Sequence, residues 1–277
     1  MSNGILINNN EAVTYIYLCG ITPERNIKLS EKIMLMPVVS SPNPDDMIDS
    51  IMKNGSGSEF ELGLLIATLR HTTAMMKIES DNAQELACLA WNSQTTCVHI
   101  GALLNCEISW YFQANKPADQ FDATTRVSMI YSNMYKFPSD LVTIDEQHCL
   151  YLENNIPIAS ILDTDTRFAN ASNALWSYRW NPRPAVQLSV IWGGIESLFL
   201  IERGIKSKLS TAASRFLSGN DNMVEKIKLL YSARCKAVHE LKNGEKELLQ
   251  TSAELLYHLI LKCVELRHIP NIDELLH

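Results

Sequence analysis

An arginine and a histidine stand five positions apart in a segment with the character of a helix, Tyr231-Ser-Ala-Arg-Cys-Lys-Ala-Val-His239. The guanidinium of Arg234 carries a permanent positive charge that suits a phosphate, and the imidazole of His239 gives or takes a proton near neutral pH. Together the two groups have the chemistry needed to cut a phosphodiester bond. Because such a pair also occurs by chance in helices, its surroundings must decide its role.

Positive charge is concentrated around this pair. Between Arg203 and Lys242 the chain has nine lysines and arginines and only three acidic residues, although its net charge is −7. The acidic remainder argues against a general nucleic-acid coat or a membrane-surface protein, since either needs a broad basic face. The basic segment is either a surface for binding an anion or a solvated face without a ligand.

The position of Arg234 on its helix predicts that its charge needs a partner. At about 100° per residue, Ile227, Leu230 and Val238 lie within about 40° of the arginine, which places it in an apolar stripe. A charge in such a place costs free energy unless it is paired. Arg234 must therefore meet an acid, line a cavity or face a subunit interface. Glu196, beside the apolar stripe of another predicted helix, is the candidate acid.

The same geometry separates the arginine from the histidine. On an ideal helix His239 lies about 140° round from Arg234, so one straight helix does not point both groups at one atom. Either the arginine side chain bends across, the helix loosens, or a second subunit supplies the converging group. Cys235 and Lys242 lie between the two groups around the helix, and Tyr231 lies nearer the arginine.

The first half of the chain predicts a mixed unit of strands and helices. Runs of β-branched and aromatic residues, broken by loops, predict short strands within 11–40 and at 108–112 and 127–135, and the apolar pattern of 59–76 predicts a helix. No motif in this half indicates a particular chemistry. We expect residues 1–140 to form an α+β domain with a sensing or regulatory role.

The second half has the period of helices throughout. Helices are expected at 143–153, at 158–180, after Pro184, and at 206–217, 222–241 and 245–268. Gly193 and Gly194 interrupt the apolar stripe of the helix after Pro184, which indicates that a neighbouring helix approaches closely there. The fold class is therefore α+β, with an all-α bundle of about five helices at 141–277.

The cysteines and the hydropathy bear on the compartment. The seven cysteines are scattered, without a C-x-x-C pair or histidines at metal-ligand spacing, which is typical of reduced thiols in a cytosol. The N-terminus has no secretory pattern, and the longest uncharged run, residues 86–106, is too polar to span a bilayer. We expect a cytoplasmic protein without a membrane partner, a metal or another cofactor.

Three motifs in the second half resemble the HEPN superfamily, specifically its Apea-like branch. They occur in the order typical of that branch, at 187–199, 208–217 and 230–239, and the resemblance covers roughly residues 145–268. It implies a helical domain that commonly pairs two-fold, so that the Arg-x4-His helices of two protomers form one cleft. Active members of the superfamily are metal-independent ribonucleases, often toxins or effectors of bacterial defence against phage.

Carried over to this chain, the resemblance gives roles to the pair. His239 would act as general base or acid around a ribose 2′-hydroxyl, and Arg234 would hold the scissile phosphate and stabilise its developing charge. The products would be a 2′,3′-cyclic phosphate and a 5′-hydroxyl. Tyr231, Lys236 and Lys242 would be the candidate substrate contacts, although lysines on a helix are usually only solvated. The implied partners are RNA and a second copy of the chain, with a regulatory protein or a nucleotide as the trigger.

One departure from the pattern leaves a second function open. Active members frequently carry Asn, Asp or His directly after the arginine, where this chain has Cys235, a weak hydrogen-bonding side chain. The alternative is a non-catalytic HEPN module that binds a nucleotide or a protein partner, with Arg234 in a structural ion pair to Glu196.

Overall fold

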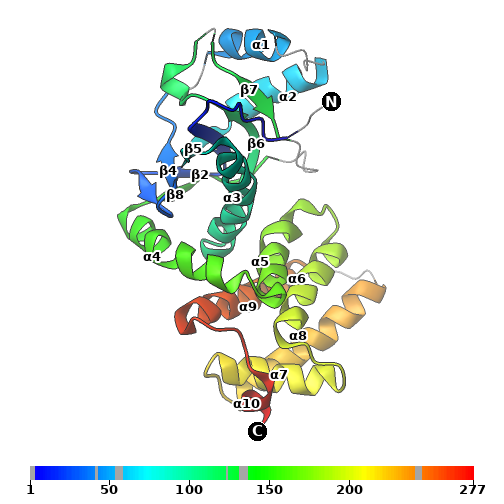
Figure 1. Cartoon of the computed structure of the whole chain (residues 1–277). Helices are drawn as coiled ribbons and strands as arrows, with labels where there is room; N and C mark the ends of the chain where they lie inside the picture. The colour runs from blue at the N-terminus through cyan, green and yellow to red at the C-terminus, as the bar shows by residue number, and fades with distance from the viewer. Residues whose placement is uncertain (1–3, 41–42, 54–58, 123, 131–136, 241–244) are drawn as a thin grey trace. The chain divides into compact units, whose positions relative to one another are not determined.

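The structure is a computed structural model that describes residues 4–40, 43–53, 59–122, 124–130, 137–240 and 245–277 (Figure 1). The chain divides into two compact units, and the α+β class expected from the sequence is confirmed. The first unit, Met1–Ile100 with Cys106–Pro157, carries the strands. The second, Gly101–Asn105 with Ile158–His277, is a bundle of helices.

A six-stranded sheet forms the centre of the first unit. Its strands are β1 (Val13–Cys19), β3 (Ile27–Lys28), β4 (Ile33–Pro37), β5 (Thr72–Glu79), β6 (Ser109–Ala114) and β7 (Val127–Met129). They lie in the order β3-β4-β5-β1-β6-β7, and each neighbouring pair is antiparallel. Because side chains alternate along each strand, the sheet has two faces that need cover.

Different helices lie on the two sides of this sheet (Figure 1). The helices are α1 (Pro44–Lys53) and α2 (Glu59–Leu69) on one side and α3 (Ala83–Leu103) on the other. Under α1 and α2, the ring of Tyr17 stacks on Phe112 with 4.4 Å between ring centres. Toward α3, the indole of Trp110 donates a hydrogen bond of 3.1 Å to the side-chain oxygen of Gln94.

The helix predicted over residues 59–76 is wrong in its second half. α2 ends at Leu69, and the residues that follow form β5. This strand lies between β4 and β1 and is hydrogen-bonded to both, so ladder formation on two edges outweighs the helix propensity of its alanine and methionines. The strand predicted at 127–135 is present at Val127–Met129, and residues 131–136 lie outside the described part of the chain.

The division between the units lies at Pro157, later than the boundary expected at residue 140. It falls within α4 (Glu146–Leu162), because the chain before it is tied to the first unit. β8 (Val142–Ile144) pairs in parallel with β2 (Ile21–Pro23). Arg25 also reaches α4, with its Nε 2.8 Å from Glu146 and its Nη1 2.7 Å from Glu153.

The short segment Gly101–Asn105 belongs to the second unit. The carbonyl of Leu103 accepts a hydrogen bond from the hydroxyl of Tyr257 at 3.3 Å, and the carbonyl of Asn105 accepts one from Nη2 of Arg179 at 3.1 Å. The bundle therefore includes residues from both halves of the sequence.

The bundle contains α5 (Thr166–Ser177), the short η2 (Tyr178–Trp180), α6 (Pro184–Phe199), α7 (Ile205–Phe216), α8 (Asp221–Glu240), α9 (Glu245–Leu266) and α10 (Ile272–Leu276). The single helix predicted at 158–180 is wrong, because the side chain of Asp165 accepts the backbone N–H of Arg167 and caps a new helix there. The helix α10 was not expected from the sequence. Among the described residues, no helix combines the length and apolar character that crossing a bilayer requires.

The two adjacent glycines of α6 have different surroundings. A Cβ on Gly194 would lie 2.6 Å from Cβ of Ala174 on α5 and 3.0 Å from Cδ2 of Leu256 on α9, whereas a Cβ on Gly193 would meet nothing within 4 Å. The close helix approach expected from the sequence is therefore found at Gly194, and Gly193 faces open space.

We expect Gly194→Ala to lower the free energy of unfolding by about 1–3 kcal/mol, because a methyl group there overlaps atoms of two packed helices. Gly193→Ala is the matched control and should be neutral or stabilise by up to about 1 kcal/mol, since alanine favours a helix over glycine. Urea unfolding of both variants measures the difference. Equal effects of the two substitutions would contradict this packing.

Candidate functional site

The arginine singled out from the sequence is ion-paired with the acid expected to meet it. Arg234 on α8 places its Nη1 3.4 Å from Oε1 of Glu196 on α6. Their side chains are 22 % and 32 % exposed, respectively. Both charges are thus partly withdrawn from water and compensate one another, while remaining accessible from outside the bundle.

Two aromatic side chains help to hold Arg234 in position. The guanidinium carbon of Arg234 lies 5.6 Å from the ring centre of Tyr231, a contact of the cation–π kind. Tyr231 meets the fully buried Trp192 edge to face at 5.3 Å. The indole of Trp192 in turn donates a 3.1 Å hydrogen bond to the hydroxyl of Ser252 on α9. Three helices therefore hold the arginine in place through one chain of contacts.

The hydrogen-bonding capacity of Arg234 is not used up by this arrangement. Within the described part of the chain, its Nε is buried without a hydrogen-bond acceptor, and Oε1 of Glu196 is buried without a donor. A guanidinium has five N–H donors, and an ion pair at 3.4 Å is longer than a usual hydrogen bond. The carboxylate of Glu196 therefore does not satisfy all the donors of this arginine.

The charges of the pair act on the phenol of Tyr231. Burial raises the pKa of Tyr231 above its usual value, the negative charge of Glu196 raises it further, and the positive charge of Arg234 opposes them. The phenol is consequently protonated at neutral pH and offers a hydrogen-bond donor beside the guanidinium.

Tyr231 also lines an open groove whose charged lining residues are two lysines and Glu202. The groove has a volume of about 680 Å³ and runs past the first turn of α7, where Lys206 lies, to Lys228 on α8. Lys206 is exposed, and Lys228 is 2.7 Å from its neighbour Glu225 on the same helix. The ring of Tyr231 offers a surface on which a base can stack, and the exposed Lys206 offers a cation for a phosphate.

Sequence reasoning did not single out these two lysines. Lys206 and Lys228 are part of the basic segment, but nothing in the sequence separates them from its other cations. The spacing of Lys228 and Tyr231, three residues apart on one helix, is the signal that could have found Lys228, because such residues share a face. Lys206 is brought to the groove by the turn before α7, which the sequence does not specify.

The other predicted site residues lie where the structure gives no side-chain geometry. Lys236 and His239 are within α8, but their side chains lie outside the described ones, and Lys242 falls outside the described residues altogether. The convergence of Arg234 and His239 on one phosphate therefore stays a prediction. Cys235, the departure from the family pattern, is a partly buried free thiol.

Metal ligation has no candidate site in the residues that the structure describes, since they contain no cluster of three or more His, Cys, Asp or Glu side chains suited to an ion. No protein-family model, curated protein or solved structure matches the chain. The function is therefore inferred from the residues and their geometry.

A double-mutant cycle measures the ion pair. We expect Arg234→Ala to lower the free energy of unfolding by about 1–3 kcal/mol, because it leaves a buried carboxylate oxygen uncompensated. In the double variant with Glu196→Ala, the loss should be smaller than the sum of the single losses by about 1 kcal/mol. Strictly additive losses would show that the two charges do not interact.

The pKa of Tyr231 gives a second test with opposite signs. Glu196→Gln removes a negative charge and should lower this pKa relative to the wild type, whereas Arg234→Ala removes a positive charge and should raise it. NMR titration of tyrosine labelled with ¹³C at Cζ follows the phenol directly, and Tyr231→Phe assigns its signal. Shifts of the same sign in both variants would contradict the arrangement.

Proposed function

We propose that this chain is a metal-independent endoribonuclease of HEPN type, with Arg234 as the phosphate-binding residue and His239 as the proton-transfer residue. The observation that supports this most is the position of Tyr231, which contacts the guanidinium of Arg234 on one side and lines the lysine-bearing groove on the other. The candidate catalytic arginine thus adjoins a surface suited to RNA.

Substrate binding in this proposal uses the groove. Lys206 attracts a phosphate of a single strand, and a base stacks on the ring of Tyr231. The acidic charge of the remaining chain confines this attraction to one region. RNA binding should accordingly weaken as salt concentration rises.

The chemistry in this proposal is an internal transfer of the phosphoryl group. The ribose 2′-oxygen attacks the adjacent phosphorus, and the bond from phosphorus to the 5′-oxygen breaks. The imidazole of His239 takes the proton of the 2′-hydroxyl, and the imidazolium so formed returns a proton to the departing 5′-oxygen. Arg234 stabilises the charge that develops on the phosphate oxygens. A 2′,3′-cyclic phosphate and a 5′-hydroxyl result.

Two-fold pairing completes the site in this proposal. On one helix the two side chains are about 140° apart, so the arginine of one protomer and the histidine of a second copy converge more readily than the two residues of one protomer. The ribonuclease is then an effector in the cytoplasm, active as a homodimer and triggered through its first unit by a nucleotide or a regulatory protein.

A second function is favoured by the ion pair itself. If Glu196 holds Arg234 permanently, the pair is a structural element of the bundle, and the chain is a non-catalytic module that binds a nucleotide or a protein partner. This function needs no role for His239 and accounts for Cys235 after the arginine.

RNA cleavage in the presence of EDTA separates the two functions. For a ribonuclease we expect cleavage that survives chelation, cyclic-phosphate ends by mass spectrometry, and a loss of at least about 100-fold in both Arg234→Ala and His239→Ala. Arg183→Ala removes the same charge at an exposed position before α6 and is the matched control. Its activity should equal that of the wild type.

The opposite pattern would support the non-catalytic module. RNA would remain intact at every protein concentration, including those at which the chain is dimeric. Arg234→Ala would lower the stability of the bundle, and His239→Ala would leave stability unchanged. Growth of cells that express the wild type or His239→Ala gives an independent readout, since only an active ribonuclease makes the two differ.

A further inference from the structure

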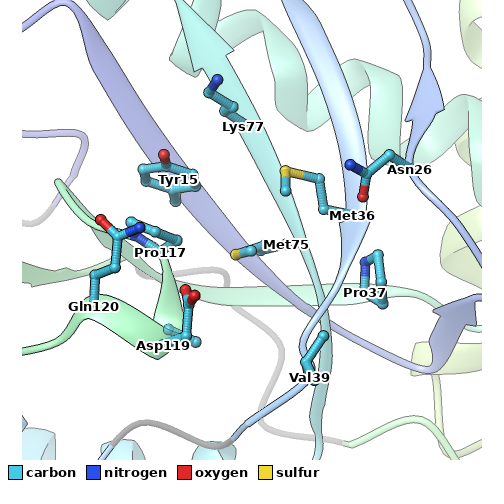
Figure 2. A pocket seen from close by; sticks show the side chains of 11 residues that line it. Tyr15, Asn26, Met36, Pro37, Val39, Met75, Lys77, Pro117, Asp119 and Gln120 are labelled. Carbon is cyan, nitrogen blue, oxygen red and sulfur yellow. The ribbon is translucent and has the colours of Figure 1, made fainter.

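A second concave site lies in the first unit, on the sheet over β5. The pocket has a volume of about 280 Å³, and Met75 of β5 lies in the middle of its lining, with Lys77 of the same strand at its upper edge in Figure 2. Tyr15 of β1 and the short helix η1 (Ala118–Gln120) stand on one side. Asn26 and Met36 stand on the other. This volume lies just below the range of ligand pockets, which run from about 300 to 1,000 Å³, so it suits a small ligand or one part of a larger ligand.

Strand register explains why these side chains share one face. Tyr15 is paired with Lys77, and Met36 with Met75, so all four point to the same side of the sheet. Tyr17, two residues along β1, lies on this side too and is buried in the cluster with residues of α1 and α2. The pocket therefore lies on the same face of the sheet that these helices cover, beside Tyr15.

The inner surface of the pocket is apolar and polarizable. The ring of Tyr15 and the thioethers of Met36 and Met75 face it from three adjacent strands, and Pro117 adds a flat ring beside Tyr15 (Figure 2). Methionine sulfur and aromatic rings pack well against a planar π-system. Such a lining suits a flat heterocycle better than a sugar or a flexible aliphatic chain.

Polar side chains lie around the rim of this surface. The carboxylate of Asp119 and the amides of Asn26 and Gln120 are exposed there, and within the described residues none of these three side chains has a hydrogen bond or an ion pair. The hydroxyl of Tyr15 joins them, on a residue that is only 7 % exposed. Burial raises its pKa, so this phenol stays protonated and donates.

The charges select the kind of ligand. Lys77 lies 2.5 Å from Glu79 on the same strand, so its positive charge is already compensated. The uncompensated charge that faces the pocket is the carboxylate of Asp119, which accepts N–H groups and repels phosphates. A neutral heterocycle with an exocyclic amino group satisfies the carboxylate, and its ring nitrogen or carbonyl accepts from the phenol.

We propose that this pocket binds the amino-bearing base of a nucleoside, stacked between Tyr15 and Met36 over Met75, with its amino group on Asp119. This site belongs to the first unit and does not depend on RNA cleavage by the second.

Calorimetric titration of the full chain with adenosine, guanosine, cytidine and uridine tests the proposal. Uridine lacks an exocyclic amino group and is the ligand control. At least one of the other three should saturate the protein below about 1 mM, and cytidine or a purine nucleoside should bind at least about tenfold more tightly than uridine. Saturation by none of the four, or equal binding of all four, would overturn the proposal.

Variants of the chain locate the binding. Asp119→Asn keeps the shape of the side chain and removes its charge, and should weaken the bound nucleoside at least about tenfold. Tyr15→Phe removes only the hydroxyl and should weaken it about threefold to tenfold. Asp81→Asn makes the same charge change at an exposed position outside the pocket, and Arg234→Ala lies in the other unit. Both should bind like the wild type. Unchanged binding in Asp119→Asn, or loss in either control, would refute this site.

Discussion

The close approach of three helices at Gly194 determines where the charged groups of the second unit stand. A hydrogen atom in place of a side chain lets α6 lie against Ala174 of α5 and Leu256 of α9. Trp192 precedes this point by half a turn and is fully buried, and Glu196 follows it by half a turn and remains partly exposed. A bulkier residue at the crossing would move both, and with them the partners of Tyr231 and Arg234.

This packing leaves the ion pair of Arg234 and Glu196 partly buried and partly exposed. A fully buried pair would have no donor left for a substrate, and a fully exposed one would have no fixed orientation. Here the guanidinium is oriented by an aromatic ring and a carboxylate, while its Nε–H has no acceptor among the described residues. Preorganised donors of this kind are what phosphate recognition requires.

The sequence predicted those features that depend on local periodicity. The helical second half and the pairing of Arg234 with Glu196 follow from the spacing of apolar residues, because a charge on an apolar stripe must find an acid nearby. The strand at residues 72–79 does not follow from local periodicity, because it is stabilised by pairing with two strands distant in sequence. The pocket over β5 depends on the same long-range register, and the place of Lys206 in the groove depends on the course of a turn.

The segment Gly101–Asn105, which comprises the end of α3 and the two residues after it, belongs to the bundle and restricts how this protein can be divided. Leu103 and Asn105 accept hydrogen bonds from Tyr257 and Arg179, although the rest of the bundle starts only at Ile158. A fragment cut at the unit boundary would lack both acceptors and the backbone that carries them. The chain therefore crosses between its units more than once, so that exchange of the helical part between proteins as a simple C-terminal module would break native contacts.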